Sequence, residues 1–217
     1  MAKGTDFGGV HSHRDLNLIQ QHVDVQPAEP KLNLIDIPGA DGSKDISEQP
    51  AGRVVYNNRK LTWTFALYPG AKWHDKHRQV SNALNGKRCR ITLDDDPDYY
   101  YTGRLVVKKY NADKMLRQIT IEATCAPYRL KQWPTTIFAN LNATDQTLTL
   151  RNEKQPTVPT IEVDTETILT WGGSTITVGA GTFSSLDIEL QEGDNILQVK
   201  TTGGTGTITI TYQEGAL

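Results

Sequence analysis

A run of aspartates is the densest group of ionisable side chains in the chain. Pro97 interrupts four carboxylates, which are those of Asp94, Asp95, Asp96 and Asp98. A Ca²⁺ ion takes about six to eight oxygens from a shaped loop, and this run lacks the glycine and the distal glutamate of an EF-hand. Aspartate and proline also favour tight turns, because aspartate hydrogen-bonds the nearby backbone and proline fixes its own φ. We therefore expect no metal here, but a solvated turn or an ion pair between subunits, with basic partners near in sequence at Arg88, Arg90, Lys108 and Lys109.

The histidines are the second candidate for chemistry. His11 and His13 lie two residues apart in a glycine-rich, polar N-terminal stretch, which we expect to be an arm or a short edge strand. A metal site needs more ligands than two, so both are expected to be exposed polar side chains. His77 follows Trp73 by four residues in a helical pattern and is expected to be packed and hydrogen-bonded.

Nucleophilic and nucleotide-binding motifs are missing from the sequence. It contains no G-x-S-x-G, no P-loop and no G-x-G-x-x-G after a strand. The glycine-rich segment 203–206 lies between two short expected strands and is interpreted as a turn. Cys89 and Cys125 are too few for a disulfide framework and are expected to be reduced, structural thiols. We expect neither catalysis nor a cofactor, since acid–base work requires tuned groups in a cleft.

Hydrophobic periodicity predicts mainly β structure in the first part of the chain. Residues 61–68 alternate strictly, with Leu61, Trp63, Phe65 and Leu67 on one face. Residues 72–85 show the spacing of a helix, which Gly86 is expected to end in a left-handed conformation. Residues 103–110 and 116–125 alternate again and predict a β-hairpin. The expected fold of this part is an antiparallel β domain with one α-helix.

The composition changes near Pro134. Before Gln132 there are 20 Lys and Arg against 15 Asp and Glu, a net charge of +5; from Gln132 onward there are 3 against 10, a net charge of −7. We therefore expect two domains, residues 1–131 and 132–217. Short alternating runs in the second part predict a β-sandwich, and they lie at residues 147–151, 160–163, 175–178, 186–190, 195–200 and 207–212.

Two aromatic residues of the second part lie beside glycine turns, Trp171 and Phe183. Aromatic faces at loop tips stack on sugar rings in lectin-like sandwiches, which makes both candidates for glycan contact. The interpretation that we favour is that they fill the ends of a small core, because large aromatic side chains contribute heavily to burial.

Hydropathy gives no sign of a membrane or export segment. No apolar run approaches the roughly twenty residues of a membrane helix, and the N-terminus lacks the apolar core of a secretory signal. We expect synthesis in the cytoplasm and no membrane partner.

The order of several motifs resembles the distal tail protein (Dit) family of long-tailed bacteriophages. The resemblance covers about residues 10–130 and is carried by "ALNGK" at 83–87, "DDDPDYYY" at 94–101 and "TGRL" at 102–105, with "IPGADG" at 37–42 and "APYR" at 126–129.

The resemblance implies a structural protein of the virion tail tip, from a phage or prophage. It implies a hexameric ring closed by the first domain, with a galectin-like second domain. The ring would join the tail tube to a tail-tip hub or tail-associated protein, and DNA would pass through it without specific binding. Residues 37–49 would lie near a subunit contact. The aspartate-rich corner would be an assembly turn, with the residues Asp94, Asp95, Asp96, Asp98, Tyr99, Tyr100 and Tyr101.

Two alternatives belong to other functional classes. One is a carbohydrate-binding β-sandwich protein that contacts host-surface glycans, which glycan-array binding through Trp171 would reveal. The other is a fragment of a cell-wall hydrolase, which the missing catalytic groups disfavour and which zymography would detect.

The opposite charges of the two parts generate a prediction. If the basic first part meets the acidic second part of a neighbour, or an acidic tube surface, molar salt should loosen the assembly, because exposed charges are screened over about 8–10 Å at physiological ionic strength. Sedimentation velocity from low to molar salt measures this. An oligomer of unchanged size across that range would contradict it.

Overall fold

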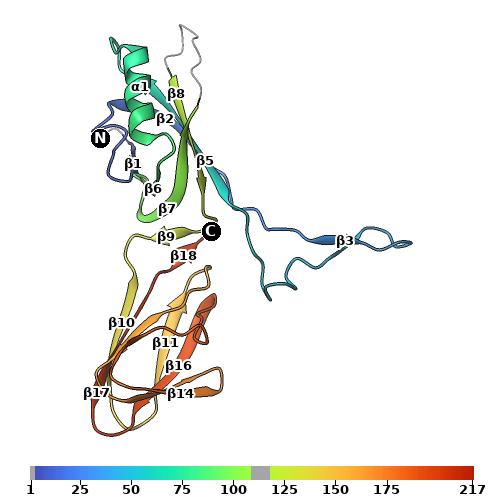
Figure 1. Ribbon diagram of the computed structural model, residues 1–217, viewed down its shortest axis with the longest axis vertical. Coiled ribbons are helices and arrows are strands. Elements are labelled where there is room, and N and C mark those ends of the chain that lie inside the picture. Colours follow the sequence, from blue (N-terminus) through green and yellow to red (C-terminus); the bar gives the residue numbers. More distant parts are fainter. Residues whose placement is uncertain (1–2, 109–117) are drawn as a thin grey trace. The chain divides into compact units, whose positions relative to one another are not determined.

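A computed structural model describes residues 3–108 and 118–217 (Figure 1). The chain forms two compact units, Met1–Arg129 and Leu130–Leu217. The mainly β fold class is confirmed, and α1 is the one helix of the described residues. This helix has 12 residues, and none in the described ranges is long and apolar enough to cross a membrane. That the first unit forms a ring and that the second is galectin-like stay predictions.

The first unit is built on six antiparallel strands in the order β1-β6-β7-β8-β5-β2. In chain order its elements are β1 (Thr5–Phe7), β2 (Leu18–Val25), β3 (Leu34–Asp36), β4 (Ser43–Asp45), β5 (Arg59–Leu67), α1 (Trp73–Leu84), β6 (Arg88–Leu93), β7 (Asp96–Val107) and β8 (Gln118–Cys125).

One face of this sheet carries the hydrophobic core. The predicted strand at 61–68 is confirmed as part of β5, in which Leu61, Trp63 and Phe65 are fully buried while the residues between them are not. The edge strand β1 adds Phe7, whose ring meets that of Trp63 edge-on with 5.1 Å between centroids. The core therefore joins β1 to β5, two strands that are not neighbours in the sheet.

The predicted helix and its end are confirmed. Val80 and Leu84 of α1 are buried in the same core, and His77 stacks on Trp73 with 4.8 Å between ring centroids. Gly86 follows with φ of +78°, a conformation that glycine adopts without steric cost.

The predicted hairpin is confirmed where the structure describes it. Residues Gly103–Val107 of β7 pair with Cys125–Ile121 of β8. Its predicted connection, and the strand ends next to it, lie in 109–117, outside the described residues.

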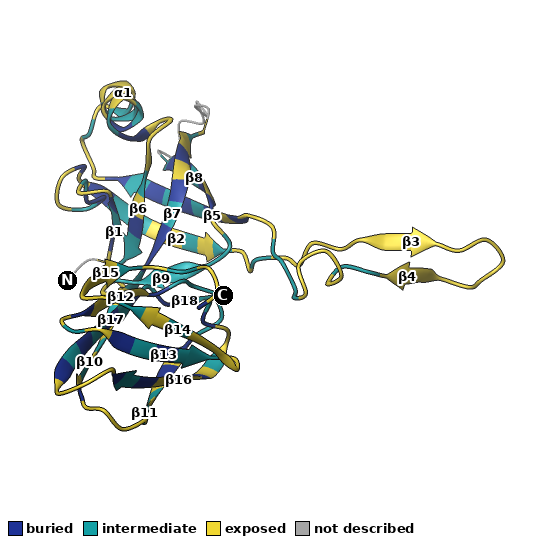
Figure 2. Cartoon of the chain, turned by 60° about the horizontal axis from the view of Figure 1, so that its bottom comes forward, coloured by how far each residue is buried: buried dark blue, intermediate teal, exposed yellow. Residues whose placement is uncertain are grey.

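A separate two-stranded hairpin leaves the first unit as an extended arm, residues 30–56 (Figure 1, Figure 2). Its base is closed by the bridge between Pro30 and Tyr56 and by the bond from Lys31 N–H to the Val55 carbonyl oxygen, at 2.8 Å. In the arm, β3 pairs with β4, with Ile35 opposite Lys44. The region expected to be a loop, 37–49, therefore includes a strand.

The second unit contains two four-stranded sheets whose buried faces share one core, so they form a β-sandwich. The sheet orders are β10-β17-β12-β15 and β11-β16-β13-β14, and a short pair joins β9 to β18. The bounds are β9 (Arg129–Lys131), β10 (Thr135–Leu141), β11 (Gln146–Asn152), β12 (Thr160–Val163), β13 (Thr167–Trp171), β14 (Ser174–Val178), β15 (Gly181–Phe183), β16 (Gly193–Thr201), β17 (Gly206–Tyr212) and β18 (Gly215–Ala216).

The prediction of a strand at 186–190 is wrong. Ile188 and Leu190 are buried as the alternation suggests, but the backbone turns there, and Leu190 makes one isolated bridge with Thr157. Two apolar side chains anchor a loop to the core as effectively as they anchor a strand.

A glycine in the middle of the first sheet gives a test of the packing. A Cβ at Gly103 would lie 2.8 Å from the Thr124 carbonyl oxygen and closer still to Sγ of Cys125. Overpacking of this kind typically costs about 1–3 kcal/mol, so Gly103→Ala should lower the free energy of unfolding by about that amount. Denaturant unfolding followed by circular dichroism measures it. Gly179→Ala, where a Cβ meets nothing within 4 Å, is the control, and equal stability of the two variants would contradict the prediction.

Candidate functional site

The aspartate-rich corner is smaller than the sequence suggests. Leu93 at the end of β6 pairs with Asp96 at the start of β7, which leaves Asp94 and Asp95 as the turn. The expectation that the whole run 94–98 forms a turn is therefore wrong, because strand pairing resumes at Asp96. Asp98 and the three tyrosines also belong to β7.

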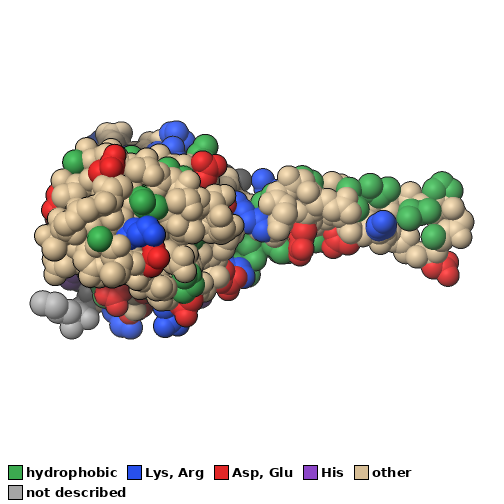
Figure 3. All heavy atoms as spheres, turned by 90° about the horizontal axis from the view of Figure 1, so that it is seen from below, with side chains coloured by type: hydrophobic (Ala, Val, Ile, Leu, Met, Phe, Trp, Pro, Cys, Tyr) green, Lys and Arg blue, Asp and Glu red, His purple; other side chains and the backbone are tan. Residues whose placement is uncertain are grey.

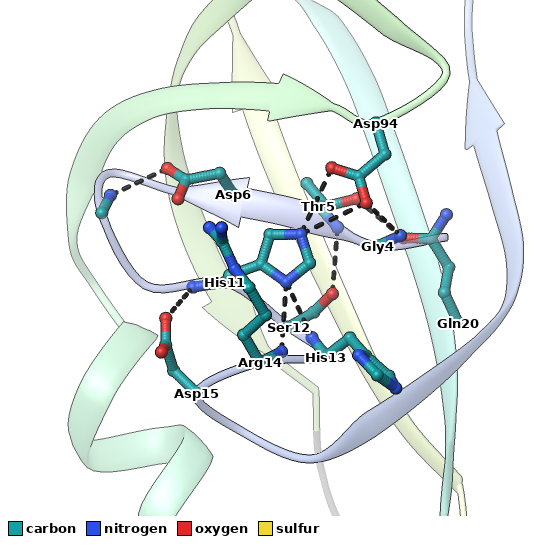
Figure 4. Close-up of polar contacts among 11 residues, drawn as sticks. Gly4, Thr5, Asp6, His11, Ser12, His13, Arg14, Asp15, Gln20 and Asp94 are labelled. Atoms are coloured by element: carbon teal, nitrogen blue, oxygen red, sulfur yellow. Dashed lines mark hydrogen bonds and ion pairs between the residues drawn. The ribbon is translucent and has the colours of Figure 1, made fainter. Parts of the chain in front are cut away.

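Asp94 binds the N-terminal segment of its own chain (Figure 4). Both its carboxylate oxygens lie 3.2 Å from Nε2 of His11, and Oδ2 accepts the Gly4 N–H at 2.8 Å. The His11 side chain is 7% exposed, so the expectation of an exposed polar histidine is wrong. Asp94 lies 83 residues from His11 in the sequence, so no local sequence pattern could have predicted this contact.

The imidazole of His11 is engaged at both nitrogens. Nδ1 accepts the backbone N–H groups of His13 and Arg14, each at 3.2 Å. A nitrogen that accepts two hydrogen bonds carries no proton, so Nε2–H donates to Asp94. No ring nitrogen is left to take a proton from a substrate, and the pair holds the fold together rather than forming a general base.

An open depression of about 700 Å³ lies beside this pair. It is lined by Lys3, Asp6, His11, His13, Arg14, Asp94 and Asp95. Within residues 3–108 and 118–217 there is no cluster of three or more His, Cys, Asp or Glu that would hold a metal ion. The expected absence of a cofactor stays a prediction.

Arginines cover the three tyrosines of the corner. The guanidinium of Arg90 lies 4.5 Å from the ring centroid of Tyr100, and those of Arg129 and Arg59 lie 4.9 and 5.6 Å from Tyr99 and Tyr101. Tyr100 and Tyr101 are buried.

Most of the aspartates of the corner bind other side chains of the same chain. Arg129 forms an ion pair with Asp96 at 3.1 Å, and Asp95 pairs with Lys3 at the surface. The corner predicted from the sequence does not include Arg59 or Arg129, since neither lies near it in sequence. The assembly role of the seven corner residues stays a prediction.

The two cysteines are free, as expected. Both flank Gly103, because Cys89 of β6 and Cys125 of β8 are its cross-strand partners. Burial raises the pKa of the Cys89 thiol and raises that of Cys125 to about 12. Thiols held in the protonated form are poor nucleophiles, which agrees with a structural role.

Neither predicted glycan contact is fully exposed. Trp171 ends β13 and Phe183 ends β15, and both are half-buried against the second core. Two aromatic residues that the sequence reasoning did not single out are far more exposed, Trp133 at 79% and Phe138 at 61%. Glycan binding through Trp171 and Phe183 stays a prediction.

The pair of Asp94 and His11 generates a prediction with a matched control. Asp94→Ala leaves the His11 Nε2–H and the Gly4 N–H without their acceptor, which should cost about 1–2 kcal/mol of unfolding free energy. Asp95→Ala removes an exposed ion pair and should cost less than about 0.5 kcal/mol. Urea unfolding of the two variants measures the difference, and equal losses would show that the buried contact is not the stabilising one.

Comparison with known proteins identifies the fold. No protein-family model matches the chain, and no curated protein matches its sequence. The crystal structure of the Dit protein (gp 19.1) of SPP1, described as a paradigm of the hub adsorption apparatus in phages that infect Gram-positive bacteria, aligns over 100% of both chains with a TM-score of 0.65 and 15% identity. The EutQ protein of Clostridium difficile aligns over 54% of this chain and 71% of its own at 15% identity, but its TM-score of 0.25 is too low to indicate a common fold. The chain has the fold of a phage distal tail protein, and at this level the resemblance seen in the sequence is confirmed.

Proposed function

We propose that this chain is a structural distal tail protein of a long-tailed phage or prophage, and not an enzyme. It forms a hexameric ring at the virion tail tip and joins the tail tube to the tail-tip proteins. The main support for this proposal is that the whole chain, both units included, aligns structurally with the whole of the SPP1 hub protein.

The arm supports self-assembly through its exposed apolar side chains. Leu34 is 53% and Ile35 47% exposed, and as neighbours in β3 they point to opposite faces of the hairpin. Figure 3 shows hydrophobic side chains along this arm, and Leu32 and Ile37 are also exposed.

An isolated two-stranded hairpin is marginally stable in water. Apolar residues on both of its faces are stabilised when another surface covers them. In the proposed ring this surface is the neighbouring subunit, which receives the arm.

The mass of the particle in solution tests the ring. Native mass spectrometry or light scattering of the full chain should give six copies, and electron microscopy should show a closed ring. Gold-labelled antibodies on virions should mark the end of the tail. A monomer that binds glycans, or labelling elsewhere on the virion, would overturn the proposal.

The arm generates its own prediction. Leu34→Thr together with Ile35→Thr keeps residues that favour β structure but removes the apolar surface. This variant should shift the mass distribution from the closed multimer toward smaller species at equal protein concentration. Lys44→Thr, at the position opposite Ile35, changes the same hairpin without removing apolar surface and should leave the multimer intact. If both variants assemble like the parent chain, the arm is not the subunit contact.

A further inference from the structure

The face of the first sheet that points away from the core carries five cations. Arg88 and Arg90 of β6 alternate with the core residue Ile91 and its half-buried neighbour Cys89, so they point outward. Arg104 of β7 points the same way, since Gly103 and Leu105 are buried. Lys60 at the start of β5 and Lys108 beyond the end of β7 add two more exposed cations. We call these five residues the basic face.

The sheet register aligns part of the basic face in one row. Arg88 lies directly opposite Arg104, Arg104 opposite Thr124, and Thr124 opposite Lys60. Neighbouring strands are about 4.8 Å apart, so the row spans about 14 Å across four strands. Like charges directly opposite one another destabilise a sheet, so the placement of Arg88 opposite Arg104 does not itself stabilise the pairing of β6 with β7.

The carboxylates of this face leave the three arginines without an ionic partner. Glu122 accepts Lys60 and Lys108 at 3.0 and 2.7 Å. Asp6 and Asp24 lie on the same face, on the edge strands β1 and β2.

Within residues 3–108 and 118–217, none of the three arginines forms an ion pair. Arg104 donates to the Gly86 carbonyl oxygen at 2.7 Å and Arg90 stacks on Tyr100. Most of their N–H groups are free to bind an anion, because a guanidinium carries five donors.

The composition of the face indicates the class of anion. Val106 is the one large apolar side chain that is exposed among its described residues. The centre of a protein–protein interface is enriched in aromatic residues and depleted of charge, which this face is not. Interfaces with nucleic acid are polar and positively charged, and arginine, lysine and threonine side chains hydrogen-bond phosphate oxygens. The outward threonines of the central strands are Thr62, Thr64, Thr92, Thr102, Thr120 and Thr124.

We propose that the basic face binds the phosphate backbone of a DNA duplex without reading its sequence. The proposal deepens the proposed tail role and rests on it for its biological ligand, because a ring at the tail tip would surround the path of the DNA. The binding itself is a property of the chain and is measured independently of ring formation.

Fluorescence anisotropy with a labelled duplex of arbitrary sequence tests the proposal on the full chain. Arg88→Gln, Arg90→Gln and Arg104→Gln together should lower affinity at least about tenfold in low salt and reduce the slope of log K against log salt by about 3, since each phosphate contact contributes about 0.9. The control replaces three exposed, scattered cations at equal loss of charge, with Lys44→Gln, Lys72→Gln and Arg78→Gln. It should keep the affinity within about twofold, because these cations make no phosphate contact.

A single substitution separates binding from folding. Arg88→Glu converts the like-charged pair with Arg104 into an opposite-charged one, so thermal stability should stay the same or rise while DNA affinity falls. A fall in affinity that is matched by a fall in stability would overturn the proposal.

Other outcomes show which of the two proposals fails. DNA binding by the basic face is contradicted if the parent chain binds no duplex at about 50 mM salt, or if the control variant loses as much affinity. Polyglutamate of matched charge that competes better than DNA would assign the face to an acidic protein and also overturn it. A closed multimer that does not bind DNA refutes the basic face alone, whereas a monomer that binds DNA through the three arginines supports it and counts against the ring.

Discussion

The first unit depends on the alternation of side chains across its central strands. Leu61, Trp63 and Phe65 must point into the core. The residues between them must then point the other way, because successive side chains of a strand lie on opposite faces. A slip of one residue in the pairing of β6 with β7 would bring Arg88 or Arg104 into the core, at the cost of a buried charge. The core therefore fixes the register, and the register places the charged residues on the outer face.

The edge of this sheet depends on a second constraint, the buried contact between His11 and Asp94. Strand β1 has three residues, so it pairs with β6 over a short length only. Asp94 binds Gly4 just before β1 and His11 just after it, so both ends of the strand are held. This positions Phe7 against Trp63 in the core. Asp94, one of the four aspartates of the corner, thus acts within its own chain.

The exposed surface features of the chain are consistent with an assembly component. Its buried histidine is engaged at both nitrogens, and the burial of Cys89 and Cys125 keeps their thiols protonated. The exposed features are instead extended: an apolar hairpin, and a sheet face with arginines on neighbouring strands. Extended features of this kind suit large partners rather than a small substrate in a cleft.

The sequence by itself determined the elements whose signal is local. The alternation at 61–67, the helical spacing from Trp73 to Leu84 and the glycine at 86 each depend on neighbours within a few residues, and the structure has all three. The prediction of a strand at 186–190 was wrong because alternating apolar residues indicate burial and not backbone pairing. Only the tertiary structure decided which distant residues meet. His11 joins Asp94 across 83 residues, and Arg88 lies opposite Arg104. The first contact follows from the pairing of β1 with β6, which are far apart in the chain. The second follows from the register of the consecutive strands β6 and β7, which the core selects.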